Sequence, residues 1–111
     1  MENHVARTKD STFKKQARVL KALANESRLK IIDRLSRGQC SVGELTELVG
    51  LDPSTVSKHL AVLRNAGLVD LRKEGTTAFY RLKVPCLEGF WGCIETVLSR
   101  NLEDQRQALE A

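Results

Sequence analysis

Start and stop signals for two consecutive helices stand in the middle of the sequence. The S-x-x-E pattern of residues 41–44 is a capping box, and Gly50 can end the helix that it opens. Asp52 can then cap a second helix, and Pro53 suits its first position because a missing N–H costs nothing there. Gly67 can terminate this second helix in the left-handed conformation. Two short helices joined by so few residues predict a helix-turn-helix.

Two more helices are predicted before this unit. Apolar residues at helical spacing indicate a first helix over about residues 12–24, namely Phe13, Ala17, Leu20 and Leu23. Asn25 can cap a second helix, which Gly38 would end. Its expected buried stripe is Leu29, Ile32 and Leu35, and that of the helix after the capping box is Leu45, Leu48 and Val49.

A hairpin and a final helix are predicted after the helix-turn-helix. Residues 68–73 and 77–82 are rich in β-branched, aromatic and apolar residues and flank a turn at Glu74 and Gly75. Pro85 then opens an amphipathic helix. The expected fold class is mainly α with a β-hairpin. A length of 111 residues allows one domain. We expect it over residues 12–102, with a flexible N-terminus at 1–11 and a C-terminal tail at 103–111.

The net charge of +4 is concentrated in one stretch. Residues 53–83 contain six lysines and arginines but only two acidic residues, whereas the rest of the chain has twelve of each. A local excess of positive charge is typical of a surface that binds a polyanion. The alternative is an uneven solvated surface without a partner.

The helix that begins at Pro53 has two different faces. Val56, Leu60 and Leu63 lie on one side and are expected to be buried. The other side carries hydroxyls, an imidazole and cations, which suit contacts with base edges and phosphates: Ser54, Thr55, Ser57, Lys58, His59 and Arg64. The sequence therefore predicts a DNA-recognition helix. His59 as a metal ligand is the alternative, but no second ligand is near it in the sequence.

The predicted hairpin carries polar and basic residues around its turn. We expect them to contact DNA phosphates and so to fix the register of the recognition helix: Arg72, Lys73, Thr76, Thr77 and Arg81. The alternative is an inert exposed hairpin with ordinary edge-strand charges.

Other classes of protein fit the sequence poorly. Neither a nucleophile with a partnered base nor a glycine-rich phosphate loop is visible, so we expect no enzymatic activity. The sequence has no apolar run of 18 residues and its first residues lack the apolar core of a secretory signal, so we expect a cytoplasmic protein without a membrane partner. In that reducing compartment the three cysteines should be free thiols. A protein-interaction module that uses the last helix is the remaining alternative.

Three strings of the sequence resemble the arsenic-repressor (ArsR/SmtB) family of metalloregulators. They are LANESRLKIIDRL at 23–35, SVGEL at 41–45 and DPSTVSKHLAVLRNAGLV at 52–69, and GTTAFYRL in the hairpin is similar as well. The resemblance covers about residues 13–100. It implies a winged helix-turn-helix, with the hairpin as the wing, that binds double-stranded operator DNA as a repressor and is released by an inducer.

The resemblance also implies a homodimer built from the first and last helices. The last helix carries more large apolar residues than one small domain can cover, which separately favours pairing. The expected interface residues are Phe13, Leu20, Leu87, Phe90, Trp91, Ile94, Val97 and Leu98.

Two inducer sites of the family are missing from this sequence. Ser41 and Gly43 stand where other members have the cysteines of C-V-C-D-L, and the last helix lacks the histidines of a zinc site. Three thiols remain, Cys40, Cys86 and Cys93, and they suit trivalent arsenic, antimony or another soft metal ion.

Cys86 and Cys93 are seven residues apart, roughly 10.5 Å along a helix, so two such thiols in one helix cannot bind one ion. Either Cys86 precedes the helix, or the two residues meet across an antiparallel pair of subunits. Gly89 and Gly92 favour the second arrangement, since glycine in a helix allows close approach. A disulfide or persulfide switch and a purely structural role remain alternatives.

Overall fold

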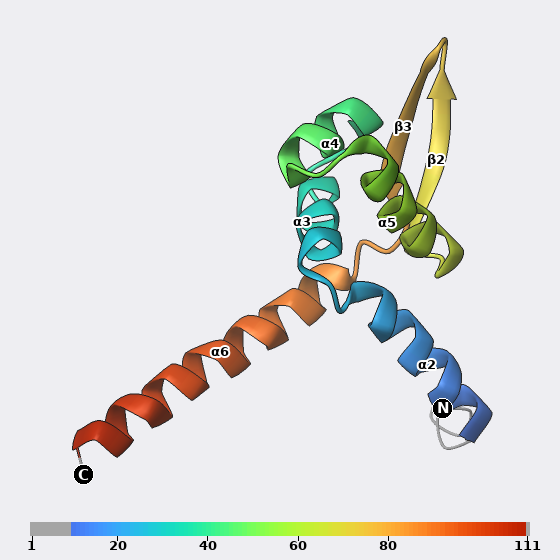
Figure 1. Cartoon of the computed structure of the whole chain (residues 1–111). Coiled ribbons are helices and arrows are strands. Elements are labelled where there is room, and N and C mark those ends of the chain that lie inside the picture. Colours follow the sequence, from blue (N-terminus) through green and yellow to red (C-terminus); the bar gives the residue numbers. More distant parts are fainter. Residues whose placement is uncertain (1–9, 111) are drawn as a thin grey trace.

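The computed structural model describes residues 10–110 and shows a small body from which two helices project (Figure 1). The body contains α3 and α4 with the α5 helix beside them, and a hairpin of β2 and β3 extends past it. In chain order the elements are α2 (Asp10–Leu23), α3 (Glu26–Leu35), β1 (Cys40–Ser41), α4 (Val42–Val49), α5 (Pro53–Asn65), β2 (Val69–Glu74), β3 (Thr77–Leu82) and α6 (Leu87–Glu110). The mainly α fold class with a β-hairpin wing is confirmed.

The predicted caps form as the sequence indicates. The Asn25 side chain accepts a hydrogen bond from the Arg28 backbone N–H at the start of α3, at 3.1 Å. At the start of α4, the capping box between Ser41 and Glu44 is complete in both directions. Gly50 ends α4 with a φ of +75°, a left-handed conformation that favours glycine. Gly50 thus begins the turn that separates α4 from α5.

The sheet has one strand that the sequence did not reveal. Its order is β1-β3-β2, with all pairs antiparallel. The short β1 pairs Cys40 with Tyr80 and Ser41 with Phe79. Two residues are too few for an alternating pattern to be visible in the sequence. The pairing attaches the beginning of α4 to the hairpin.

The core lies between α3, α4, α5 and the base of the hairpin. Its most deeply buried side chains are Ile31, Ile32, Leu45, Val56, Leu60, Leu63 and Val69, with Cys40 among them. Two expected core residues are wrong: Leu29 and Leu48 are exposed at 37% and 46%. In α3 the buried position belongs to Ile31 instead, because Leu29 faces a groove between α3 and α6.

The α6 helix has 24 residues, about 36 Å, and leaves the body near its beginning. Every residue of it from Gly92 to Glu110 is exposed. The radius of gyration is 17.2 Å, whereas about 13 Å is usual for a compact chain of this length. The helix passes the boundary that we expected at residue 102, so 103–110 are helical. At the other end, Asp10 and Ser11 belong to α2, and the remainder of the expected flexible N-terminus lies outside the described residues.

None of the helices between residues 10 and 110 is both long and apolar enough to cross a lipid bilayer.

Candidate nucleic-acid interface

The α5 helix presents one face to the core and the other to solvent. Val56, Leu60 and Leu63 anchor it, each at 1% exposure or less. On the outer side the structure places Ser54, Ser57, Lys58 and Arg64 as exposed residues and Thr55 and His59 as half-buried ones. The division into two faces follows the sequence prediction, and it leaves Ser54, Ser57 and Lys58 near the N-terminus of α5 exposed to solvent.

The two hydroxyls at the start of α5 are already engaged with Asp52. The Ser54 hydroxyl donates a hydrogen bond to the Asp52 carboxylate, and the Thr55 hydroxyl donates another at 2.6 Å. The Thr55 backbone N–H is a third donor, at 3.1 Å. Hydrogen bonds from Ser54 and Thr55 lower the pKa of Asp52 to about 2. The sequence indicated Asp52 as a cap but did not reveal these side-chain bonds.

His59 is not simply a surface residue. Its Nδ1 lies 3.3 Å from Nη1 of Arg28 on α3. Because a guanidinium can only donate, this contact requires an unprotonated Nδ1 on the imidazole. The Nε of Arg28 is buried and has no hydrogen-bond partner within residues 10–110. The pair links α5 to α3, so His59 has a packing contact in addition to its place on the outer face.

The hairpin carries its expected residues toward its tip. Arg72, Lys73, Thr76 and Thr77 are all exposed, and Gly75 turns the chain with a φ of +63°. Figure 1 shows β2 and β3 extending past α4 and α5, with the turn at the far end. The hairpin therefore extends these cations away from the body, while its β2 strand packs against α5.

Arg81 is held differently from the other basic residues of the hairpin. Its Nε and Nη2 donate to the two carboxylate oxygens of Asp70, at 2.8 Å and 3.3 Å. The two residues face each other in the register of β2 and β3. The hydrogen bonds lower the pKa of Asp70 and raise that of Arg81. Arg81 is thus engaged by an ion-pair partner across the strands. Arg72 and Lys73 are the hairpin cations that lie closer to the turn.

A second candidate surface lies on the projecting helices. Phe90, Ile94, Val97 and Leu98 of α6 are exposed, as are Phe13 and Leu20 of α2. A groove of about 370 Å³ runs between α3 and α6, lined by Leu29 and several of these α6 residues. Leu87 is instead buried in the core of the single chain, and Trp91 packs against that core. Of the expected interface residues, these two already have partners in the chain itself.

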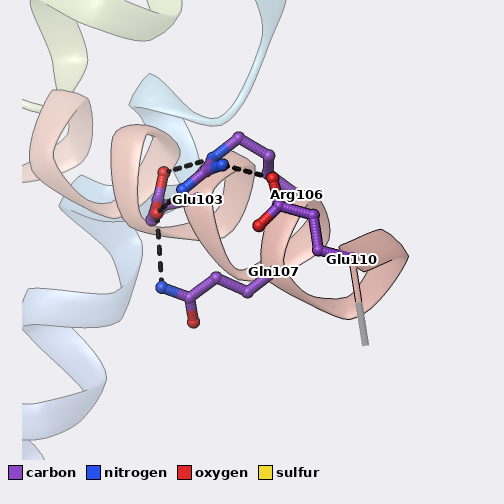
Figure 2. Close-up of polar contacts among 4 residues, drawn as sticks. All are labelled: Glu103, Arg106, Gln107 and Glu110. Carbon is purple, nitrogen blue, oxygen red and sulfur yellow. Dashed lines mark hydrogen bonds and ion pairs between the residues drawn. The ribbon is translucent and has the colours of Figure 1, made fainter.

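The far end of α6 is stabilised by its own side chains (Figure 2). Arg106 donates two hydrogen bonds to Glu103, at 2.6 Å and 3.0 Å, and another to Glu110, at 2.6 Å. Gln107 also donates to Glu103, at 3.2 Å. These pairs are three or four residues apart, the spacing at which side chains meet on a helix. They support the helix locally without contact to the body.

The three cysteines lie in different environments. Cys40 is buried at 1% exposure, and burial raises the pKa of its thiol. Cys86 is exposed just before α6, and Cys93 is exposed on it. Within residues 10–110 no group of three cysteine, histidine or acidic side chains is placed to hold a metal ion. Because α6 begins at Leu87, Cys86 precedes the helix, which is one of the two arrangements that the spacing allowed.

Comparison with known proteins gives a consistent result. Residues 25–70 match the family described as "Bacterial regulatory protein, arsR family". The chain is similar to the transcriptional activator HlyU of Vibrio cholerae, with 52% identity over 64 residues, 58% of this chain and 59% of that protein. It is also similar to the HTH-type transcriptional regulator Rv0081 of Mycobacterium tuberculosis, with 36% identity over 99 residues, 88% of this chain and 87% of that one. It spans only 39% of the regulator Rv0324 of the same organism.

Comparison with solved structures also finds transcriptional regulators of similar fold. The crystal structure of Rv0081 has a TM-score of 0.78 at 35% identity and covers 87% of this chain and 98% of its own. The homodimeric winged helix-turn-helix domain of Mb0332 from Mycobacterium bovis has a TM-score of 0.73 at 34% identity, with 85% and 87% covered. The transcriptional repressor BigR from Xylella fastidiosa has a TM-score of 0.70 at 31% identity, with 86% and 93% covered.

Proposed function

Because the chain belongs to the arsR family of bacterial regulatory proteins, we propose that it is a dimeric repressor that binds operator DNA in the cytoplasm. It is a transcriptional regulator of this family and not an enzyme. The observation that carries the proposal is the exposure of Ser54, Ser57 and Lys58 on α5, a helix that packs against the hairpin bearing Arg72 and Lys73.

In the proposed complex α5 enters the major groove. Its N-terminal residues face the base edges, and Lys58 and Arg64 contact phosphates. Arg72 and Lys73 of the wing contact the backbone beside the groove, which fixes the register. The buried anchors Val56, Leu60 and Leu63 keep the helix in place, so its outer side chains meet DNA without rearrangement of the core.

The dimer forms through α6 and α2. Both helices expose apolar side chains that the chain itself does not cover, and the homodimeric relative Mb0332 has the same fold. A twofold particle places two recognition helices in successive major grooves about 34 Å apart. A repressor of this form blocks transcription by occupying the operator.

Fluorescence anisotropy with promoter DNA tests this function. Binding should weaken steeply between two salt concentrations, because phosphate contacts release counterions. Lys58→Glu or Arg72→Glu should abolish binding while the dimer persists by analytical ultracentrifugation. Arg37→Glu makes the same charge change on an exposed residue in the turn after α3 and is the matched control, for which binding should be retained. Undiminished binding by both interface variants, or a protein that binds only other proteins through α6, would refute the proposal.

We propose that the inducer is a soft metal or metalloid ion, such as trivalent arsenic or antimony, bound by cysteine thiolates. Cys86 and Cys93 are the stronger candidates, since both are exposed and lie at the helix proposed for dimerisation. Cys40 is the weaker candidate, because a buried thiol with a raised pKa is seldom the thiolate that an ion needs. Ligands from both subunits would couple ion binding to the angle between them, and this coupling must be reciprocal.

Titration of the reduced protein–operator complex with arsenite, zinc and a persulfide donor tests the inducer. Arsenite should release wild type, and Cys93→Ser should repress normally but respond weakly. Cys40→Ser is the control and should respond as wild type does. Equal arsenite affinity with and without operator DNA contradicts the mechanism. Release by the persulfide donor alone favours the redox alternative, which needs two thiols whose Cα atoms come within about 7 Å.

A further inference from the structure

We propose that Asp52 fixes the hydrogen-bond polarity of Ser54 and Thr55, so that these side chains recognise amino groups of DNA bases as acceptors only. The inference rests on the proposed function, since it concerns how α5 selects a sequence. It makes Asp52 a specificity-determining residue although its own carboxylate has no donor to offer a base.

The geometry at the start of α5 carries the argument. Both oxygens of the Asp52 carboxylate are in use: Oδ2 accepts from the Ser54 hydroxyl and the Thr55 backbone N–H, and Oδ1 accepts from the Thr55 hydroxyl. A hydroxyl has one hydrogen and two lone pairs. In Ser54 and Thr55 that hydrogen is directed at Asp52, and only lone pairs remain for another partner.

A base is a poor competitor for these hydrogens. Hydrogen bonds to an ionised carboxylate are about twice as strong as those between neutral groups. The oxygen of a guanine or thymine is a neutral acceptor and would have to displace such a bond. The low pKa of Asp52, about 2, agrees with a carboxylate that stays ionised near neutral pH.

The consequence is a preference that an unrestrained hydroxyl would not have. Serine and threonine hydroxyls generally contact either donors or acceptors on bases. When the hydroxyl hydrogen is donated to Asp52, the available partners in the major groove are the N6 amine of adenine and the N4 amine of cytosine. Guanine and thymine present acceptors there and are disfavoured. Ser54 and Thr55 should therefore prefer adenine or cytosine at the base positions that they contact.

The test begins with selection of the preferred duplex from random DNA by the wild-type dimer. The positions that lose selectivity in Ser54→Ala and Thr55→Val are those that the two hydroxyls contact. At these positions we expect adenine or cytosine. Replacement by purine or 2-pyrimidinone, which lack the amine, should weaken wild-type binding about fivefold, the effect of one hydrogen bond. The corresponding variant should not respond to the replacement.

Asp52→Asn tests the role of the carboxylate itself. Asparagine is an equally good helix cap, but its amide has one accepting oxygen for two hydroxyls, so one hydroxyl regains a free hydrogen. Selected sites should then tolerate guanine or thymine at one position. Ser41→Ala removes a cap from α4 and is the control for loss of helix stability; its base preference should match wild type.

Different results refute the inference and the function. A wild type that prefers guanine or thymine at both positions, or that ignores removal of the amine, overturns the inference while DNA binding stands. An unchanged preference in Asp52→Asn overturns it as well. Absence of binding to every duplex would instead refute the proposed function.

Discussion

The α5 helix and the α6 helix are both amphipathic, yet only one of them has its apolar face covered. The inward apolar side chains of α5, Val56, Leu60 and Leu63, are buried in the core at 1% exposure or less. Those of α6 are buried only at its first turns, through Leu87 and Trp91, and its residues from Gly92 onward are exposed. The difference indicates two tasks: α5 has the rigid support that recognition requires, whereas α6 is completed by a second copy in the proposed dimer.

The largest effect is expected when charged side chains are placed on the uncovered apolar face of α6. Ile94→Glu together with Leu98→Glu places two carboxylates on the exposed apolar face of α6. The dimer should dissociate, and operator affinity should fall by more than tenfold because a monomer binds one half-site. Sedimentation and anisotropy measure the two effects. The body should keep its thermal unfolding transition, since neither residue belongs to its core.

Leu109→Glu is the matched control for that pair. Leu109 lies on the same helix but close to its end, and it is 89% exposed. Its substitution should leave the dimer intact. A dimer that survives the double substitution, or is lost equally in the control, would show that α6 does not pair through the face of Ile94 and Leu98.

An intermediate effect is expected from the two glycines of α6. A Cβ added at Gly89 or Gly92 would meet no atom of the chain within 4 Å. In an isolated chain, alanine at each position should therefore stabilise the helix by about 1 kcal/mol. Where two helices approach closely at these positions, the added methyl groups separate them and weaken the dimer. Sedimentation of Gly89→Ala and Gly92→Ala at several concentrations measures the direction. Tighter association in both variants would contradict close approach at this site.

The two regions also differ in how far the sequence predicted them. The caps at Asn25, Ser41 and Asp52 were predicted correctly because each involves residues within one helical turn. The exposure of Leu29 was not predicted, since it depends on where α6 lies. In the same way, the engagement of Arg81 by Asp70 depends on strand register, and that of His59 by Arg28 depends on packing between α3 and α5.

The candidate site follows the same division. Periodicity placed Lys58 and Ser57 on the outer face of α5, because a helix buried on one side must expose the other. The hydrogens of Ser54 and Thr55 could not be assigned in this way, since a cap residue can accept from the backbone alone. In the proposed dimer, whether the three cysteines meet would depend on how two chains pair, which no local pattern in one sequence records.

The smallest effect concerns the acid stability of the cap of α5. The hydrogen bonds from Ser54 and Thr55 hold the pKa of Asp52 near 2, below its ordinary value of 3.8. A carboxyl whose pKa is lowered by folding stabilises the folded state above the higher of these values. The contribution is lost as the pH falls from about 4 to about 2. Wild type should thus unfold at higher temperature than Asp52→Ala at pH 5, and the difference should disappear toward pH 2.

A carboxyl group on α6 allows the same comparison with the cap of α5. Side-chain hydrogen bonds from Arg106 and Gln107 lower the pKa of Glu103 on α6, but this group supports only the end of a projecting helix. Glu103→Gln should therefore change helicity measured by circular dichroism without moving the unfolding temperature of the body. A shift as large as that of Asp52→Ala would mean that the end of α6 unfolds together with α5, and that the body and the projecting helix are one cooperative unit.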